Sequence, residues 1–524
     1  MKRACKYFYK KRISIKRVPS NSIKKTKNIN EMKTIFLLLI IVISFSLSST
    51  SQENIKLSLD DVIQIASKQS IDAFRNKNMY LASYWEYRFY KAERLPGIAL
   101  STTPVDYNRF LKKEYNFETN EDEYRLREYV NSDIGIAATQ NVGFTGGQLF
   151  LRSEVAMIKN LSGDQNTSYS ATPFSIGFSQ ELNGYNELKW KSKIEPLKFE
   201  KAKKEFIQDI EDLRIKSTMQ FFELITAQIQ KGIASTNYAN ADTLYKIGKG
   251  RFQVGTVTQD ELLKMELSLL NAEQALSMAQ LEEKRAQASL NSFLGMEKTV
   301  EIECIVPSEI PELQIDPDIA LTQAVQNNPE MINHQQQKLQ QDQNVKRTRS
   351  ETGLNTSLFA MYGRSKSSEE FTDVYGQPDK SQRFNVGINV PIVDWGRTKG
   401  RVSMAESNRE VVLATIKQER IDFEMDIFQS VMEFNLQGSQ VKNAAKADTV
   451  AQLGYDVTFQ RFLIGKIDVI KLNIASTDQE TARISYLNRL RDYWSSYFRL
   501  RSLTLFDFET DTPLMVNYDD ILEK

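Results

Sequence analysis

The chain has 524 residues, of which 41% are hydrophobic and 26% are charged, so it can build a large packed core and does not have the composition of a disordered chain. Its formal net charge of +1 is unevenly distributed, because residues 1–50 carry 12 Lys and Arg and one acid, whereas the rest carries 56 Lys and Arg against 66 Asp and Glu. An acidic body argues against nucleic-acid binding, since neutralising phosphates needs clustered basic side chains.

The basic N-terminal arm over residues 1–51 has the layout of a secretory signal peptide. Met32 and Lys33 precede an apolar run over residues 35–43, and small residues follow at 48–51. We expect Met32 to be the true start and the arm to be removed on export, because the apolar run is shorter than the roughly 20 residues of a membrane-anchoring helix. No Cys directly follows the run, so a lipid anchor is not expected.

The rest of the chain contains two diverged copies of one unit. Residues 174–177 match residues 384–387 as Phe-x-x-Gly, and residues 251–255 match residues 461–465 as Arg-Phe-x-x-Gly, each pair 210 residues apart. The starts of the copies are 258 residues apart, so the first copy holds about 48 more residues than the second. The predicted parts after the arm are a first repeat over 52–296, a linker over 297–316, a second repeat over 317–506 and a tail over 507–524.

Each copy is expected to begin with a short and a longer helix, over about 59–94 and 317–352, and then to change to a period of two. Small or polar residues alternate with an apolar row in the second copy, and 148–157 and 174–179 show the same pattern in the first. The apolar row of the second copy comprises Phe384, Val386, Ile388, Val390 and Ile392. These lengths suit strands of a transmembrane barrel with lipid outside and water inside, although a soluble sheet with one wet face would show the same alternation. The extra residues are expected within 107–170, either as enlarged external loops or as an additional hairpin.

A long helical hairpin is expected to follow in each copy, because residues 197–306 and 392–512 contain no proline. Residues 187–252 alone would span roughly 100 Å at about 1.5 Å per residue, which is too long for a compact globule. The next helix carries a coiled-coil stripe in steps of three and four, and beside it lies a second apolar row of Leu263, Leu267, Leu270, Met278 and Leu281. Two rows need neighbours on both sides, as in a closed cylinder of helices, and an ordinary long bundle or antiparallel stalk is the alternative.

This order of elements, written twice, is similar to that of the TolC-like outer membrane efflux proteins over about residues 57–505. The similarity is carried by residues 59–66 and 318–329 at the starts of the copies, by Val-Pro-Ile-Val-Asp-Trp-Gly-Arg at 390–397, and by the two Arg-Phe-x-x-Gly turns. The resemblance implies a mainly α fold with transmembrane β strands, in which three copies share one 12-stranded β-barrel that continues as a long α-helical coiled-coil tunnel. Sharing is physically required, since the roughly four to six strands of one chain are too few for a closed barrel in lipid.

The resemblance also implies a function and partners. The chain would be an outer-membrane channel subunit of a Gram-negative tripartite export system, with a large periplasmic portion, acting as a passive conduit for small-molecule efflux. Its partners would be two further copies in a homotrimer, a periplasmic adaptor of the membrane fusion class, an inner-membrane pump of resistance-nodulation-division or ABC type, and outer-membrane lipid. The alternatives are the outer-membrane component of type I protein secretion and, in a different class, a periplasmic coiled-coil adaptor or structural protein without a pore.

By the same resemblance, two turns are expected at the periplasmic tip, where family members close the tunnel and meet the adaptor. These turns comprise Gly255, Thr256 and Val257 in the first copy and Gly465, Lys466 and Ile467 in the second. A purely structural role of the glycines in tight turns is the alternative.

The charges near this tip differ from the pattern of the best-studied family members. Those members place two acids six and nine residues after the second glycine, and Lys471 and Ile474 occupy these positions here, so that acidic ring is not expected. Asp260, Glu261 and Asp468 are candidate charges near the mouth, or else solvated acids at helix ends.

No catalytic, cofactor or metal site is expected. His334 is the only histidine and is expected at the surface, so metal sites and catalytic arrangements based on histidine are not expected. Cys304 is expected to be a packed small side chain, and the aromatic segment 491–498 is expected to pack between helices rather than to mark the bilayer interface. The sequence has no Walker-type loop, so the energy for export must come from outside the chain.

Overall fold

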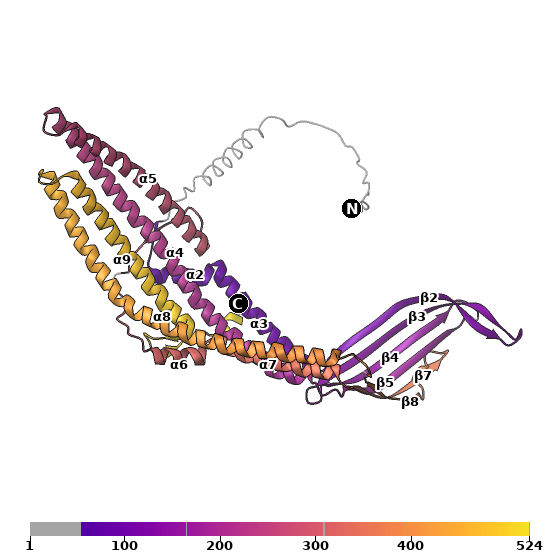
Figure 1. The fold of residues 1–524 in the computed structure, drawn as a ribbon. Helices are drawn as coiled ribbons and strands as arrows, with labels where there is room; N and C mark the ends of the chain where they lie inside the picture. The colour runs from indigo at the N-terminus through magenta and orange to yellow at the C-terminus, as the bar shows by residue number, and fades with distance from the viewer. Residues whose placement is uncertain (1–53, 164, 308–309, 391, 523–524) are drawn as a thin grey trace, which may run out of the picture. The chain divides into compact units, whose positions relative to one another are not determined.

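The computed structural model describes residues 54–163, 165–307, 310–390 and 392–522, nearly all of which belong to one compact unit that begins at Ile55. The predicted signal peptide and Met32 lie outside the described residues. The long helices of both copies run side by side, and a single sheet lies at one end of them (Figure 1). The helices of the first copy are α2 (Leu59–Gln69), α3 (Ile71–Glu93), α4 (Glu187–Gln253) and α5 (Gln259–Leu294). Those of the second are α6 (Pro317–Asn327), α7 (Pro329–Thr352), α8 (Arg397–Leu463) and α9 (Val469–Thr504).

The helices begin where side chains can bond the free backbone N–H groups of a first turn. Ser58 and Asp61 form a capping box at the start of α2, and the Asn328 side chain accepts a hydrogen bond from the Glu330 backbone N–H at the start of α7. α4 and α8 have 67 residues each, which confirms the predicted long helices. None of the helices in the described part of the chain combines the length and the hydrophobicity that a membrane span requires.

Six strands form one antiparallel sheet in the order β2-β3-β4-β5-β7-β8, so strands of both copies share it. The strands are β2 (Gly97–Asn116), β3 (Glu121–Val142), β4 (Gly147–Asn160), β5 (Thr167–Glu181), β7 (Asn355–Ser368) and β8 (Asp379–Asn389). The spacing of 210 residues aligns β4 and β5 with β7 and β8, so the hairpin β2–β3 is the part that the first copy has in addition. Of the two alternatives left open for the extra residues, the structure shows the additional hairpin, which begins at Gly97, ahead of the expected window.

The described chain has six strands in this sheet because the inserted hairpin pairs with β4, which agrees with the roughly four to six strands expected of one chain. The expected end of the last strand needs correction. Val390 and Ile392 were expected to continue the last strand, but β8 ends at Asn389. The proline at position 391 has no backbone N–H to donate to a neighbouring strand, which explains why the alternation in the sequence extends beyond the strand.

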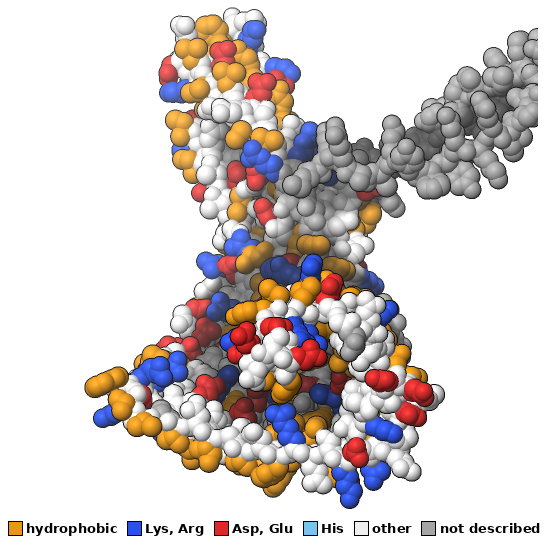
Figure 2. Space-filling view, turned by 90° about the vertical axis from the view of Figure 1, so that its right-hand side faces the viewer, with side chains coloured by type: hydrophobic (Ala, Val, Ile, Leu, Met, Phe, Trp, Pro, Cys, Tyr) orange, Lys and Arg blue, Asp and Glu red, His pale blue; other side chains and the backbone are white. Residues whose placement is uncertain are grey.

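The two faces of the sheet differ in character. Directly paired residues lie on the same face, and one such row is apolar across five strands and ends at Gln382 on β8. Its first five members are Ile98, Ala138, Leu151, Ile176 and Tyr362. The adjacent row, on the other face, comprises Ala99, Ala137, Arg152, Ser175, Gly363 and Ser381. In Figure 2, hydrophobic side chains gather along the outer side of the curved sheet and charged side chains lie within the curve. One face is therefore apolar and the other small or polar, as the period of two predicted.

The main core lies where the two copies meet, around the middle of α4. Phe221 and Phe222 of α4 pack in one buried cluster with Phe434 of α8 and with Tyr493 and Tyr497 of α9. The aromatic segment of α9 therefore packs between helices, as predicted. Beside the core, Arg501 Nε donates to Glu211 Oε2 at 2.9 Å, and this buried ion pair joins α9 to α4.

Short elements connect and complete the copies. Strand β1 (Asn54–Leu57) pairs with β6 (Glu301–Cys304), which lies inside the predicted linker, and Cys304 packs against the main core. Burial raises the pKa of the Cys304 thiol to about 12, which makes a nucleophilic thiolate unfavourable, in agreement with the expected packing role. The remaining elements are η1 (Asp373–Tyr375), the pair β9 (Phe506–Asp507) and β10 (Thr512–Pro513), and α10 (Asp519–Leu522).

Candidate functional site at the helical tips

Two tight turns join the long helices, and both lie at the end of the helices away from the sheet (Figure 1). The Thr256 backbone N–H donates to the Arg251 carbonyl at 3.0 Å, and the Gly255 N–H donates to the Phe252 carbonyl at 3.0 Å. This pair of bonds is a Schellman motif, which needs a residue with positive φ, and Gly255 has φ +76°. The sequence therefore ends α4 here because glycine adopts this conformation without steric cost.

The second copy repeats this geometry. The Lys466 N–H donates to the Arg461 carbonyl at 3.0 Å, the Gly465 N–H donates to the Phe462 carbonyl at 2.9 Å, and Gly465 has φ +74°. An added Cβ would meet no atom within 4 Å at Gly255 or Gly465. The turns therefore face open space, and their conformation rather than crowding requires glycine.

The predicted mouth charges lie at the starts of the two helices that follow the turns. Glu261 forms a capping box with Thr258 at the start of α5, and Asp468 accepts a hydrogen bond from the Lys471 backbone N–H at 2.9 Å at the start of α9. Asp260 forms an exposed ion pair with Lys264 at 2.7 Å. Each of these three acids thus has a local partner, and those at helix starts also interact favourably with the helix dipole.

The two hairpins contact each other close to the tips through residues that the sequence did not single out for this role. Leu244 of α4 packs with Tyr455 and Phe462 of α8 and with Leu472 of α9, and we name these four residues the tip cluster. The Asn240 side-chain amide donates to the Tyr455 hydroxyl at 2.6 Å, which bonds the first hairpin to the second. The signals in the sequence were Tyr455, which matches Tyr245 at the spacing of 210 residues, and Phe462, which belongs to the second Arg-Phe-x-x-Gly stretch.

A groove of about 800 Å³ runs beside the tip cluster between the hairpins. Its polar lining comes mainly from amide and hydroxyl side chains, including Asn237, Asn240, Asn271, Asn473 and Ser476. Ser476 of α9 also donates to the Asn237 side chain of α4 at 3.1 Å. Neutral amides and hydroxyls can bond water or one another across the groove, and they offer no activated nucleophile.

Helix contacts give the order α5-α4-α9-α8 near the tips and α3-α4-α7-α8 near the sheet. The outermost helices keep apolar side chains in contact with solvent in the described chain. On α5 these include Leu263, Leu267, Leu270, Met278 and Leu281, which form the second row predicted from the sequence. On α3 they include Phe74, Trp85 and Phe89, and on α8 they include Met404, Val411, Met425, Val450, Leu453 and Val457.

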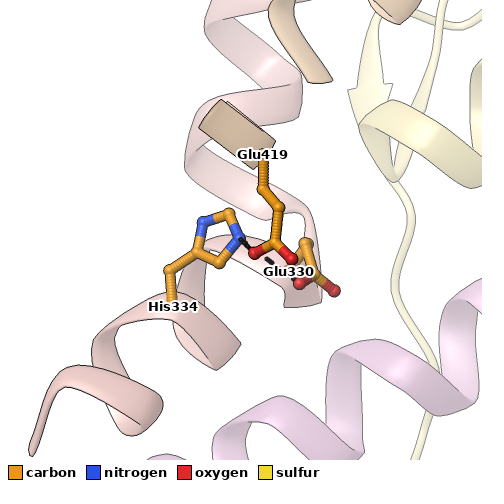
Figure 3. A group of neighbouring side chains, drawn as sticks. All are labelled: Glu330, His334 and Glu419. Atoms are coloured by element: carbon orange, nitrogen blue, oxygen red, sulfur yellow. Dashed lines mark hydrogen bonds and ion pairs between the residues drawn. The ribbon is translucent and has the colours of Figure 1, made fainter. Parts of the chain in front are cut away.

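A separate cluster lies between α7 and α8 and contains the one histidine (Figure 3). His334 is 7% exposed, so the expectation of a surface histidine was wrong. Its Nε2 atom lies 3.1 Å from Glu419 Oε2 of α8 and 3.4 Å from Glu330 Oε1, one turn earlier on α7. One ligand atom from each residue lies within 4.8 Å of the others, which is close enough to bind a metal ion. The same distances fit a hydrogen-bonded link between the two helices, which needs no ion.

One comparison with known proteins identifies a family, and another identifies the fold. The family model described as Outer membrane efflux protein matches residues 142–296 and 320–504. Comparison with curated protein sequences found no match. The protein is also similar in structure to the CmeC outer membrane channel of Campylobacter jejuni, with a TM-score of 0.62, 15% identity and coverage of 89% of this chain and 88% of that one.

Two further solved structures share the fold. A membrane protein from Pseudomonas aeruginosa gives a TM-score of 0.61 at 13% identity, covering 88% of this chain and 92% of that one. The outer membrane protein VceC of Vibrio cholerae gives a TM-score of 0.54 at 12% identity, covering 87% of this chain and 97% of that one. At such identities the similarity establishes the arrangement of helices and sheet.

Proposed function

The chain belongs to the outer membrane efflux protein family, and on this premise we propose that three copies close one continuous tunnel whose tips receive substrate from a periplasmic adaptor and an inner-membrane pump. As a family member, it is an outer-membrane channel of a tripartite efflux system in a Gram-negative bacterium, with a large periplasmic portion. It is a passive conduit rather than an enzyme. A periplasmic adaptor without a pore, the alternative from a different class, is thereby excluded.

The observation that supports a trimer is that the row of helices and the sheet each have two outer edges with no neighbour in the described chain. The exposed apolar row of α5 belongs to the first copy, and α8 on the opposite side belongs to the second copy and carries its own exposed row. The sheet likewise has β2 and β8 as its edges. Fully burying a leucine or methionine stabilises an assembly by about 1.5–3 kcal/mol, so rows of such residues favour side-by-side association.

Ring closure follows from the order of these edges. When the second-copy side of one chain meets the first-copy side of the next, every junction is of the same kind, which is a heterologous contact that can close into a ring. An open sheet edge in lipid would leave backbone N–H and C=O groups without partners, so closure is required in the membrane. Three copies is the number implied by the family resemblance.

The test of this assembly is fractionation of cells followed by native mass measurement. We expect the mature protein in the outer-membrane fraction as a heat-modifiable oligomer with the mass of three chains. The matched variant replaces Leu263, Leu267 and Leu270 of α5 by Gln, which should weaken the oligomer because the exposed row loses its apolar character. A soluble periplasmic monomer in the wild type would contradict the proposal.

The tips are proposed as the adaptor contact because Thr256 and Lys466 are exposed on turns at the far end of the helices. A photo-crosslinking residue placed at Thr256 or Lys466 should capture the adaptor in intact cells. The same residue at Arg420, an exposed position in the middle of α8, serves as the control. Equal capture from Arg420 and from the tips would contradict a tip-specific contact.

The exported substrate is proposed to be small molecules. Deleting the gene should raise sensitivity to small toxic compounds while leaving the set of secreted proteins unchanged. Loss of one secreted protein with unchanged tolerance to these compounds would instead identify the chain as the outer-membrane component of type I protein secretion.

A further inference from the structure

The inserted hairpin β2–β3 is built as part of the barrel wall rather than as a loop outside it. β3 pairs with β4 from Tyr129–Asn160 to Val142–Gly147 without a break in register, and β2 pairs with β3 along its length apart from one bulge between Thr103 and Asp106. A flexible external loop would not require fourteen consecutive paired positions with the neighbouring strand.

The side chains of the hairpin continue the two faces of the other four strands. On the apolar face, Ile98 and Ala138 lie in one row with Leu151, and Leu100 pairs with Ile136. Ile98, Leu100 and Ile136 are all more than half exposed in the single chain. Ala99 and Ala137 continue the face of small or polar residues. This alternation is required of a strand with lipid on one side and water on the other.

The character of the hairpin changes where it extends beyond β4. Residues 121–128 of β3 have no partner on β4 in the described chain, and this part carries charged pairs such as Arg127 with Glu114 and Lys113 with Asp122. Charged side chains are costly in hydrocarbon, so this part belongs in water. The hairpin therefore has an apolar-faced half next to the helices and an outer half in which charged pairs lie among exposed apolar side chains such as Leu111 and Tyr124.

We propose that β2 of one chain pairs with β8 of the neighbouring chain in the trimer. Three six-stranded sheets would then form one barrel of eighteen strands instead of the twelve implied by the family resemblance. The inference rests on the proposed trimer. β2 and β8 are the edges of the described sheet, they run in opposite directions, and both have exposed apolar side chains on the same face. The segment of β2 between Gly97 and Thr103, ahead of the bulge that contains Pro104, supplies the pairing groups.

The dimensions of the helical layer fit this wall. Strands about 4.8 Å apart and tilted by about 40° give eighteen strands a circumference of about 110 Å, and twelve strands about 75 Å. Each chain places four helices side by side at any one level, so three chains make a ring of twelve helices. At an interaxial distance of about 9 Å this ring also has a circumference of about 110 Å. A wall of eighteen strands can therefore continue the helical ring without narrowing, and barrels of this strand number hold an aqueous channel.

Disulfide crosslinking of the full-length protein in outer membranes tests the strand order. In a background with Cys5→Ser and Cys304→Ser, Leu100→Cys on β2 is combined with Phe384→Cys, Val386→Cys or Ile388→Cys on β8. The matched control places the first cysteine on β4 as Leu151→Cys. We expect mild oxidation to link most chains into covalent dimers and trimers with a β2 cysteine, and to leave the β4 variants at background.

Native mass and an electron density map of the wild-type oligomer provide the independent readouts. A map with eighteen strands supports the inference, whereas a trimer with twelve strands, or with intermolecular links from β4 to β8, would overturn it and leave the proposed trimer intact. A trimer in which neither cysteine pair crosslinks and the hairpin lies off the wall overturns it equally. A native mass other than three chains would refute the trimer itself, and the barrel of eighteen strands with it.

Discussion

Replacing Tyr455 by Phe isolates the hydrogen bond that joins the two hairpins near the tip. The Tyr455 hydroxyl accepts from the Asn240 amide at 2.6 Å, while its ring is 7% exposed and stacks on Phe459. Phe keeps this packing, so the variant removes only the hydrogen bond, which contributes about 1 kcal/mol to the stability of each chain. If this hydrogen bond breaks when the tip opens and the three chains open together, its loss costs the closed arrangement about 3 kcal/mol, which corresponds to about a 150-fold shift toward the open arrangement.

The assay is the open probability of purified oligomers in planar bilayers, combined with thermal unfolding. We expect Tyr455→Phe to raise the open probability strongly while the melting temperature changes little. Tyr245→Phe, at the same place in the first copy but less buried, is the matched control. Asn240→Ala should reproduce the effect, and the double variant should add little to it, because both changes remove one bond. Unchanged opening in both single variants would refute the role of this contact in holding the tip closed.

Four further predictions concern the tip, the helix contacts and the core. Gly465→Asp should impair export with the oligomer intact, because it places a charge at the tip. Gly465→Ala adds backbone strain of about 1–2 kcal/mol at positive φ without the charge and should export normally. Equal export by the wild type and both variants would remove the tip assignment. Glu211→Ala should lower the free energy of unfolding by about 3 kcal/mol, because Arg501 would stay buried with Asp507 as its remaining acid. Denaturant titration measures this loss against the variant that combines Glu211→Leu with Arg501→Leu, which should lose less because it leaves no buried charge unpaired, and an equal loss in both variants would contradict the prediction. His334→Ala should lower stability by about 1–2 kcal/mol through loss of the link to α8, and a zinc-dependent rise in melting temperature confined to the wild type would show a metal site instead. Burial and the nearby Asp212 raise the pKa of Asp209 from 3.8 to about 6, so the folded state binds more protons than the unfolded state between these pH values, and the free energy of unfolding should fall as pH rises through them. Asp209→Asn should flatten this slope and stabilise the protein by about 1 kcal/mol at neutral pH, after discounting for partial exposure. An unchanged dependence of stability on pH in the variant would contradict this prediction.

The local patterns of the chain were sufficient to predict most of its elements. The period of two marked β4, β5 and most of β8, and the absence of proline together with apolar rows marked the long helices, because each of these signals is contained in one continuous stretch. The two Arg-Phe-x-x-Gly stretches predicted turns at which Gly255 and Gly465 have positive φ. The duplication added the element order, since weak signals at one place were repeated 210 residues later.

The hairpin β2–β3 shows where this reasoning reached its limit. Its length followed from the mismatch between the two spacings, but its alternation is interrupted by the bulge after Thr103 and by charged residues in its outer half. A loop and a hairpin were therefore equally consistent with the sequence. The pairing of β3 with β4 shows that the segment is a hairpin of the sheet. The period of two marks a segment as a strand, but it does not show which strand lies beside it.

The sequence by itself determined the duplicated order of elements, the long helices and the two turns, because neighbouring residues encode helix, strand and turn through local sterics and periodicity. Tertiary structure alone decided that the sheet has six strands, that Tyr455 bonds Asn240 across the hairpins, that Glu211 pairs with Arg501 from 290 positions away, and that His334 is buried between two helices. These contacts join residues far apart in the chain, and their energies depend on burial and geometry that exist after the helices and strands have packed together.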